Sequence, residues 1–347
     1  MTSTREALIA LRAANPVPAT YATVSGAPGS TSHGRGRTRA GLLVAATAGV
    51  AAVAVGIGVL PGGRGGASPA AAAALDQAAT AADITATDEA AGPDQYWRIE
   101  TDASHLTTSV EIGSDAGSIE DVSTWLGEST RVEYVAVDGA RPSWFQDGPR
   151  TITQVFSGQA QVGDVLEDVH AWTTNLAPND TAGSWQQPNA AWLAALPRET
   201  DQLRDRLYAD TDGHGRSRDG EVLVYVADLL RSGMVPADLR AALFRVLESV
   251  PGVELVRRHE DGLISIGRLE TVGGERQDIV IDPATGAYVG EQQVQTESVD
   301  GLPAGTVTTD TSVTTTVVDE VPADVRDAAD RMDCTAYDDG AIGCENP

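Results

Sequence analysis

Residues 222–256 read VLVYVADLLRSGMVPADLRAALFRVLESVPGVELV, and this stretch decides the fold. Apolar residues recur three and four apart in two runs, 221–231 and 237–250, which is typical of helices with one buried face. The apolar positions are Val222, Tyr225, Val226, Leu229 and Leu230 in the first run, and Leu239, Ala242, Leu243, Val246, Leu247 and Val250 in the second. Pro236 precedes the second helix and Pro251-Gly252 ends it. The stretch therefore predicts two half-buried helices followed by a strand.

Strands are predicted on both sides of these helices and of two shorter ones at 190–196 and 199–208. Segments rich in β-branched and aromatic residues come first, at 95–100, 109–112 and 130–137, and later at 253–258, 263–269, 277–281, 287–296 and 306–318. Short turns join the later strands, which favours antiparallel neighbours, and the order lacks βαβ alternation. The sequence predicts an α+β domain over 94–322, with an antiparallel sheet and a central helical insert.

A membrane span is predicted at 40–60, which reads AGLLVAATAGVAAVAVGIGVL and holds no charge. Its length suffices to cross roughly 30 Å of hydrocarbon as a helix. Residues 1–39 hold five Arg and one acid, whereas 19 Arg face 49 acids beyond the span. The positive-inside rule then places the N-terminus in the cytoplasm and the acidic bulk outside the cell membrane. The alternative is a signal peptide cleaved near the Ala-rich residues 70–74.

The remaining segments flank this span and the domain. Residues 1–39 are expected to be cytoplasmic and mostly disordered, with a short helix at 4–14 that is either frayed or a docking peptide. Residues 61–93 hold a Gly-rich hinge and an Ala-rich helix. Residues 323–347 form a C-terminal segment with the two cysteines of the chain.

Cys334 and Cys344 are expected to form a disulfide. They lie in the part placed outside, their number is even, and Asp339-Gly340 between them favours a chain reversal. Two free thiols in a frayed tail are the alternative.

Composition excludes several classes of enzyme and partner. All 24 basic residues are Arg, so lysine-dependent phosphate loops, kinases and Schiff-base chemistry are excluded. Two Cys are too few for Cys₄ zinc or iron–sulfur sites, and neither H-E-x-x-H nor G-x-S-x-G occurs. A net charge of −26 disfavours nucleic acid as a partner. We therefore expect no catalytic residues, no cofactor and no enzymatic activity.

One loop resembles a calcium-binding loop weakly. In DTDGHGRSRDGE, residues 210–221, the residues Asp210, Asp212 and Glu221 occupy positions 1, 3 and 12. His214 stands where position 5 normally supplies an oxygen, and three Arg nearby disfavour a cation. A solvated acidic loop between helices is the other interpretation.

The chain also resembles a known family. The segments EALIALRAANPVP, PDQYWRIET, LPRETDQLRDRLYAD and IVIDPATGAYVGE, together with 222–256, resemble actinobacterial single-pass membrane proteins of unassigned function. Genes of that family often stand beside one for an extracytoplasmic-function sigma factor. The resemblance implies a role in envelope sensing or sigma-factor control, and it implies no catalytic residues.

Three functions remain open at this point. The first is a membrane-anchored protein that binds or senses an unknown protein or envelope ligand outside the cell membrane. The second is an anti-sigma-like regulator that binds a sigma factor through residues 1–18, although 1–39 lacks the His and Cys cluster of zinc-type anti-sigma factors. The third is a hydrolase of the cell envelope.

Overall fold

The computed structural model describes residues 65–85, 88, 90–112, 119–166, 170–337 and 342–345. All of them belong to one compact unit. The predicted span at 40–60 lies outside the described residues. Within the described ranges, no helix is both long enough and apolar enough to cross a membrane.

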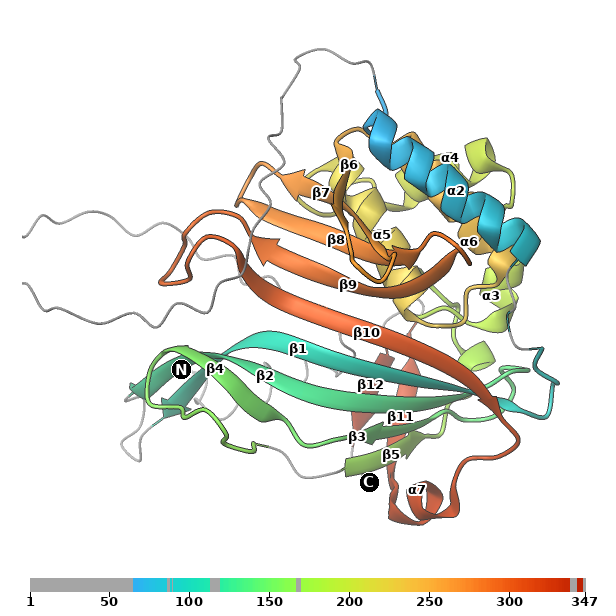
Figure 1. The fold of residues 1–347 in the computed structure, drawn as a ribbon. Helices are drawn as coiled ribbons and strands as arrows, with labels where there is room; N and C mark the ends of the chain where they lie inside the picture. Colours follow the sequence, from blue (N-terminus) through green and yellow to red (C-terminus); the bar gives the residue numbers. More distant parts are fainter. Residues whose placement is uncertain are drawn as a thin grey trace, which may run out of the picture. The chain divides into compact units, whose positions relative to one another are not determined.

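The fold is built on one sheet of twelve strands in the order β12-β11-β5-β3-β2-β1-β10-β9-β8-β7-β6, with β4 paired to β2 (Figure 1). The strands are β1 Tyr96–Ile112, β2 Ile119–Ala136, β3 Trp144–Asp147, β4 Thr151–Ser157, β5 His170–Thr174, β6 Val253–Arg258, β7 Ile264–Glu270, β8 Glu275–Asp282, β9 Ala287–Gln295, β10 Thr306–Val318, β11 Asp330–Ala336 and β12 Ile342–Glu345. Neighbours are antiparallel except β11 and β5, which run parallel. The prediction of an α+β fold with a largely antiparallel sheet is confirmed.

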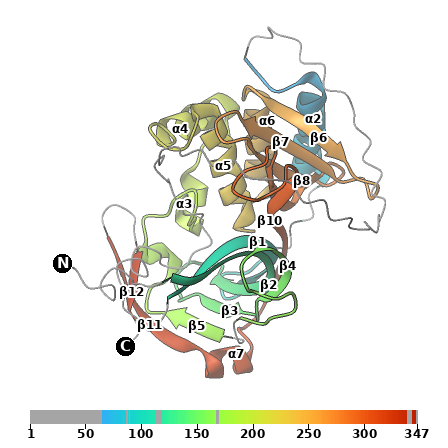
Figure 2. The ribbon, with the colours of Figure 1, turned by 90° about the vertical axis from the view of Figure 1, so that its left-hand side faces the viewer.

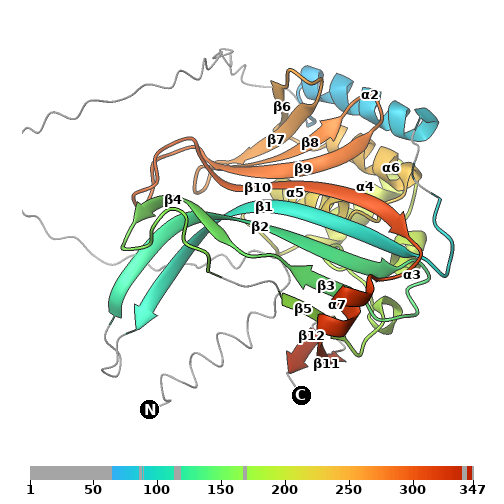
Figure 3. The ribbon, with the colours of Figure 1, turned by 60° about the horizontal axis from the view of Figure 1, so that its bottom comes forward.

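The first two strands are longer than predicted. The sequence indicated separate strands at 95–100 and 109–112, but β1 runs unbroken through Tyr96–Ile112. This prediction was wrong because the intervening residues TDASHLTT have few apolar side chains and give no clear alternation. Their backbone is instead held by neighbours, since β1 pairs with β2 along its length and with β10 from Tyr96 to His105. The β1–β2 hairpin extends beyond β10 together with β4 (Figure 3).

Four helices, α2, α4, α5 and α6, lie together beside the strands β6–β9, and a fifth, α3, lies toward β1 and β2 (Figures 1 and 2). They are α2 Pro69–Thr85, α3 Ala190–Ala195, α4 Thr200–Asp210, α5 Arg218–Arg231 and α6 Ala237–Glu248. The predicted apolar stripes of α5 and α6 are buried, apart from the half-buried Tyr225, and they pack on isoleucines of β7 and β8. Those isoleucines are Ile264, Ile266, Ile279 and Ile281. The helix periodicity therefore identified the main core correctly.

The Ala-rich helix α2 packs against α6 and the turn between β8 and β9. Its buried positions are Ala71, Ala74, Leu75, Ala78, Ala79 and Ala82. Gly286 of the turn has a positive φ of 69°, and a Cβ placed there would lie 2.5 Å from the Ala78 carbonyl oxygen. The small residues on both elements allow this close approach of helix and turn.

A smaller core lies on the opposite face of the sheet, under helix α7 Ala323–Ala328. It holds Val132, Tyr134, Ala171, Val321 and Val325. After α7 the chain re-enters the sheet as β11, which pairs with β5 (Figure 3). The C-terminal segment thus forms the edge of the sheet.

Candidate functional site

An open cavity of about 240 Å³ lies between α3, the start of β1 and the end of β2, and we call it the α3 cavity. The lining residues are Trp97, Val135, Ala136, Val137 and Gly139 from the β1–β2 side, Pro178, Asn189, Ala190, Leu193, Ala194 and Arg198 from the α3 side, and Met234 and Pro236 between α5 and α6. Ala190 and Ala194 are exposed, so the cavity opens to solvent beside α3.

Asn189 holds α3 over this cavity. It is buried, and its Oδ1 accepts a hydrogen bond from the Trp192 N–H at 2.8 Å, which caps the helix. Its Nδ2 donates to the carbonyl oxygens of Pro178 and Thr181 at 3.1 and 3.0 Å. A helix of six residues is unstable alone, so these three bonds fix the outer wall of the cavity.

The opposite wall is set by the connection between α5 and α6. Gly233 has a positive φ of 67°, and a Cβ there would lie 2.4 Å from Thr315 Oγ1 of β10. Thr315 Oγ1 also donates to the Gly233 carbonyl oxygen at 3.1 Å. This contact presses the connection against the sheet and places the next residue, Met234, in the cavity wall.

Arg198 lies at one end of the cavity and makes three hydrogen bonds there. Its Nε donates to Asp238 Oδ2 at 2.9 Å. Its Nη1 donates to the carbonyl oxygens of Leu193 and Leu196 at 2.9 and 2.7 Å. The guanidinium therefore links the C-terminal end of α3 to α6 through hydrogen bonds.

A buried charged cluster lies on the helix-facing side of the sheet, and we call it the Arg231 network. Arg231, at the end of α5, pairs with Asp228 of the same helix and with Glu291 of β9. Glu291 Oε2 also accepts from Gln277 Nε2 of β8 at 3.3 Å. Burial raises the pKa of both Asp228 and Glu291, and the charge of Arg231 opposes that rise. Two carboxylates thus share one guanidinium inside the fold.

The same face of the sheet carries further titratable groups toward β1 and β2. Burial and the charges of nearby arginines, Arg150, Arg231 and Arg131, lower the pKa of His105 to about 4. Burial raises the pKa of Glu133. Arg131 pairs with Asp147 of β3, its Nε 2.5 Å from Asp147 Oδ1. At physiological pH His105 is therefore neutral, although its ordinary pKa is near 6.5.

The residues of the proposed calcium loop have other contacts in the structure. Asp210 Oδ2 accepts hydrogen bonds from Trp185 Nε1 at 2.8 Å and Arg206 Nε at 2.5 Å. Asp212 is exposed, and burial raises the pKa of Glu221, which disfavours its anion. Among the described residues, no group of three or more His, Cys, Asp and Glu side chains could hold a metal ion.

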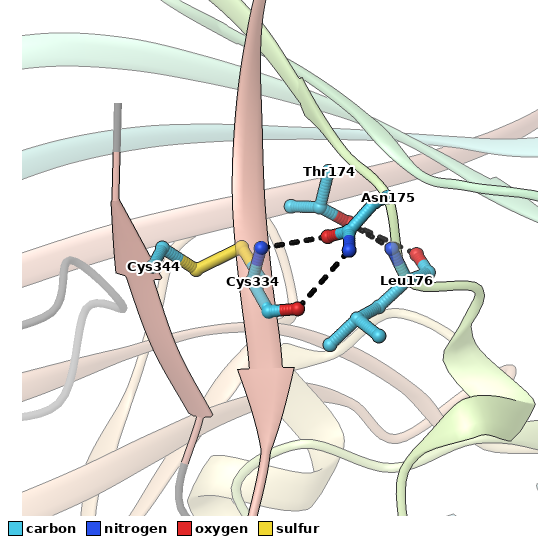
Figure 4. Close-up of a disulfide and its surroundings, with 5 residues drawn as sticks. All are labelled: Thr174, Asn175, Leu176, Cys334 and Cys344. Carbon is cyan, nitrogen blue, oxygen red and sulfur yellow. Dashed lines mark hydrogen bonds between the residues drawn. A yellow bond between two sulfur atoms is a disulfide. The ribbon is translucent and has the colours of Figure 1, made fainter. Parts of the chain in front are cut away.

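Cys334 and Cys344 are joined by a disulfide, as expected from the sequence (Figure 4). They face each other across β11 and β12. The Asn175 side chain binds the Cys334 backbone on both sides: its Oδ1 accepts from the N–H at 2.7 Å and its Nδ2 donates to the carbonyl at 3.2 Å (Figure 4). The bridge is thereby attached to the turn that follows β5.

Comparison with known proteins gives little. No protein-family model and no curated protein matches the chain. A crystal structure of a DUF1329 family protein from Desulfovibrio piger aligns with 72% of this chain and 93% of its own, at 10% identity and a TM-score of 0.17. So low a score supports no argument about fold or function.

Sequence reasoning missed both the α3 cavity and the Arg231 network. The cavity joins residues from five separate segments, and no motif links them. The network left a partial signal, since Asp228 interrupts the apolar stripe of its helix and Arg231 follows one turn later. Their partner Glu291 is 60 residues away from Arg231, and only the folded sheet brings it close.

Proposed function

We propose that the chain is a membrane-anchored sensor whose domain outside the cell membrane binds a ligand in the α3 cavity and has no catalytic activity. The observation that carries the proposal is the cavity itself, a preformed hollow between helix and sheet that opens to solvent. Its walls come from separate parts of the chain, so a bound molecule would contact α3, the α5–α6 connection and β1 together. This position suits a sensor, because a ligand bound there would change how α3, the α5–α6 connection and β1 pack together.

The membrane arrangement is part of the proposal. The uncharged span at 40–60, the Arg before it and the acidic domain after it support a single pass with the N-terminus in the cytoplasm. The disulfide supports an oxidising location for the domain. Protease added to spheroplasts is expected to digest the domain and spare an N-terminal tag, and protection of the domain would contradict this topology.

A second candidate is an anti-sigma-like regulator that signals inward. Its support is the helix predicted at 4–14 and the resemblance to proteins encoded beside sigma factors. Copurification of a sigma factor that is lost when residues 1–18 are deleted would favour it. In this case the α3 cavity would be the input site and residues 1–18 the output.

The ligand proposal is tested on full-length protein purified from its own membranes. Small molecules released by denaturation are compared by mass spectrometry between the wild type and Ala194→Trp, which fills the cavity mouth. We expect at least one compound that is enriched in the wild type and retained in Ala195→Trp, because Ala195 is exposed but does not line the cavity. If the compounds released by the wild type and Ala194→Trp are the same, the α3 cavity is not the ligand site.

A further inference from the structure

We infer that the α3 cavity selects an uncharged apolar group, such as a fused ring pair or a short branched hydrocarbon end. This inference rests on the proposed function, because it names the chemical class of the ligand for the same site. It follows from three properties of the wall: the engagement of its polar side chains, its apolar surface and its volume.

The charged and amide side chains of the wall are largely engaged within the protein. Asn189 uses its Oδ1 on the Trp192 N–H and its Nδ2 on two carbonyl oxygens. Arg198 uses Nε on Asp238 and Nη1 on two carbonyl oxygens. A charged ligand would lose water on entry, and the charged side chain of the wall, Arg198, is already paired with Asp238, so entry of a charge is unfavourable. Ligand charge is therefore selected against.

The rest of the wall is apolar and includes two surfaces suited to a ring. Trp97 supplies a flat aromatic side chain, and Met234 supplies a flexible, polarisable one. Val135, Val137 and Leu193 complete the apolar contacts. Contact with these side chains, rather than hydrogen bonding, would hold the ligand.

The volume limits the size of the group. A 150 Å³ apolar cavity in another protein accommodates benzene, so 240 Å³ corresponds to a group of roughly ten carbon atoms. Since the cavity is open beside Ala190 and Ala194, a longer molecule can insert such a group and leave its remainder in solvent. A polar portion of the ligand would then lie outside.

Met234 provides a direct test, because the chain has three methionines and, of the two that the structure describes, Met234 lines the cavity and Met332 does not. Full-length protein in lipid nanodiscs is labelled with methyl-¹³C methionine, and the Met234 signal is assigned with Met234→Leu. Indole is the neutral probe, and indole-3-acetate and tryptamine are its anionic and cationic relatives. Indole is expected to shift the Met234 signal saturably and to leave that of Met332, on β11, in place.

Two variants separate the cavity from nonspecific binding. Ala194→Trp is expected to weaken indole binding at least tenfold, and Ala195→Trp to change it less than twofold. The charged relatives are expected to bind at least tenfold more weakly than indole. Equal or tighter binding of a charged relative would overturn the inference but leave the proposed ligand site intact.

Two other results also overturn the inference. The first is no Met234 shift with any of the three probes. The second is an indole shift that persists in Ala194→Trp. The proposed function is judged separately by the compounds that copurify with the protein: a charged compound lost in Ala194→Trp would support the function and contradict the apolar selection.

Discussion

Replacing Arg231 by Met should strongly destabilise the domain. The Arg231 side chain is 13% exposed, and its partners Asp228 and Glu291 are 7% and 0% exposed. The substitution leaves two buried carboxylates without a counter-charge, and breaking a buried pair in this way costs about 3–5 kcal/mol. That loss is a large part of the roughly 5–15 kcal/mol by which a domain is stable. Urea unfolding followed by tryptophan fluorescence measures it.

Arg204 offers a matched control. It also lies between two acids, with Nη1 3.0 Å from Asp201 and Nη2 3.6 Å from Asp205, but these acids are 83% and 78% exposed. Solvent screens such pairs, so Arg204→Met should change the unfolding free energy by at most about 1 kcal/mol. If Arg231→Met costs no more than Arg204→Met, the Arg231 network does not hold α5 to the sheet as argued.

The deficit of Arg231→Met should also depend on pH. Burial raises the pKa of Asp228 and Glu291 in the folded state above their unfolded values, so the folded state binds protons more tightly. That contribution stabilises the fold at low pH and is lost as pH rises through the folded pKa. Without Arg231 both carboxylates protonate more readily, and the deficit should shrink between about pH 7.5 and about pH 5. A deficit that stays constant over this range would refute the electrostatic explanation.

Three further outcomes are expected. Cys344→Ser should speed proteolysis of the C-terminal segment. It should shift the main thermal transition little, because the bridge joins two strands at the edge of the sheet, away from the main core, and its contribution of roughly 2–3 kcal/mol acts on that segment; a large loss of melting temperature would contradict this. Asn189→Ala should cost about 1–3 kcal/mol in urea unfolding, because it removes the cap of Trp192 and the amide donor to the carbonyl oxygens of Pro178 and Thr181. An unchanged midpoint would show that α3 is held otherwise. The imidazole of His105 should stay neutral in an NMR titration until about pH 4. Because its folded pKa is lowered, this group should destabilise the fold as pH falls below about 6.5. A titration with a midpoint near pH 6.5 would contradict its placement among arginines.

The helices and β10 could be predicted from sequence, whereas the full length of β1 and β2 could not, for a physical reason. In α5 and α6 the apolar side chains repeat every three or four residues, so the local sequence alone identifies the buried face. In β1 the middle of the strand reads TDASHLTT, and its mostly polar side chains gave no clear alternation. Such a strand depends on neighbours distant in sequence rather than on its own composition.

The candidate sites follow the same division. The disulfide could be predicted because two cysteines allow one intramolecular pairing. The α3 cavity could not, because its wall joins Trp97 with Met234, and their proximity depends on how α5 and β1 meet across the sheet. Asp210 shows the opposite case. The loop pattern places it as a calcium ligand, but in the fold its carboxylate accepts hydrogen bonds from Trp185 and Arg206.

The position of β10 has a consequence for how the chain matures. In the sheet order, β10 stands between β1 and β9 and is the strand that joins the N-terminal hairpin to the later meander. β1 starts at Tyr96 and β10 ends at Val318, so roughly 10–40 s of ribosomal synthesis separates them at ordinary elongation rates. During that interval the β1 edge that β10 will cover stays open, and an open edge can pair with another chain. A nascent chain halted before residue 306 therefore carries two unjoined halves of a sheet, and chaperones that protect extended segments would be needed most at that stage.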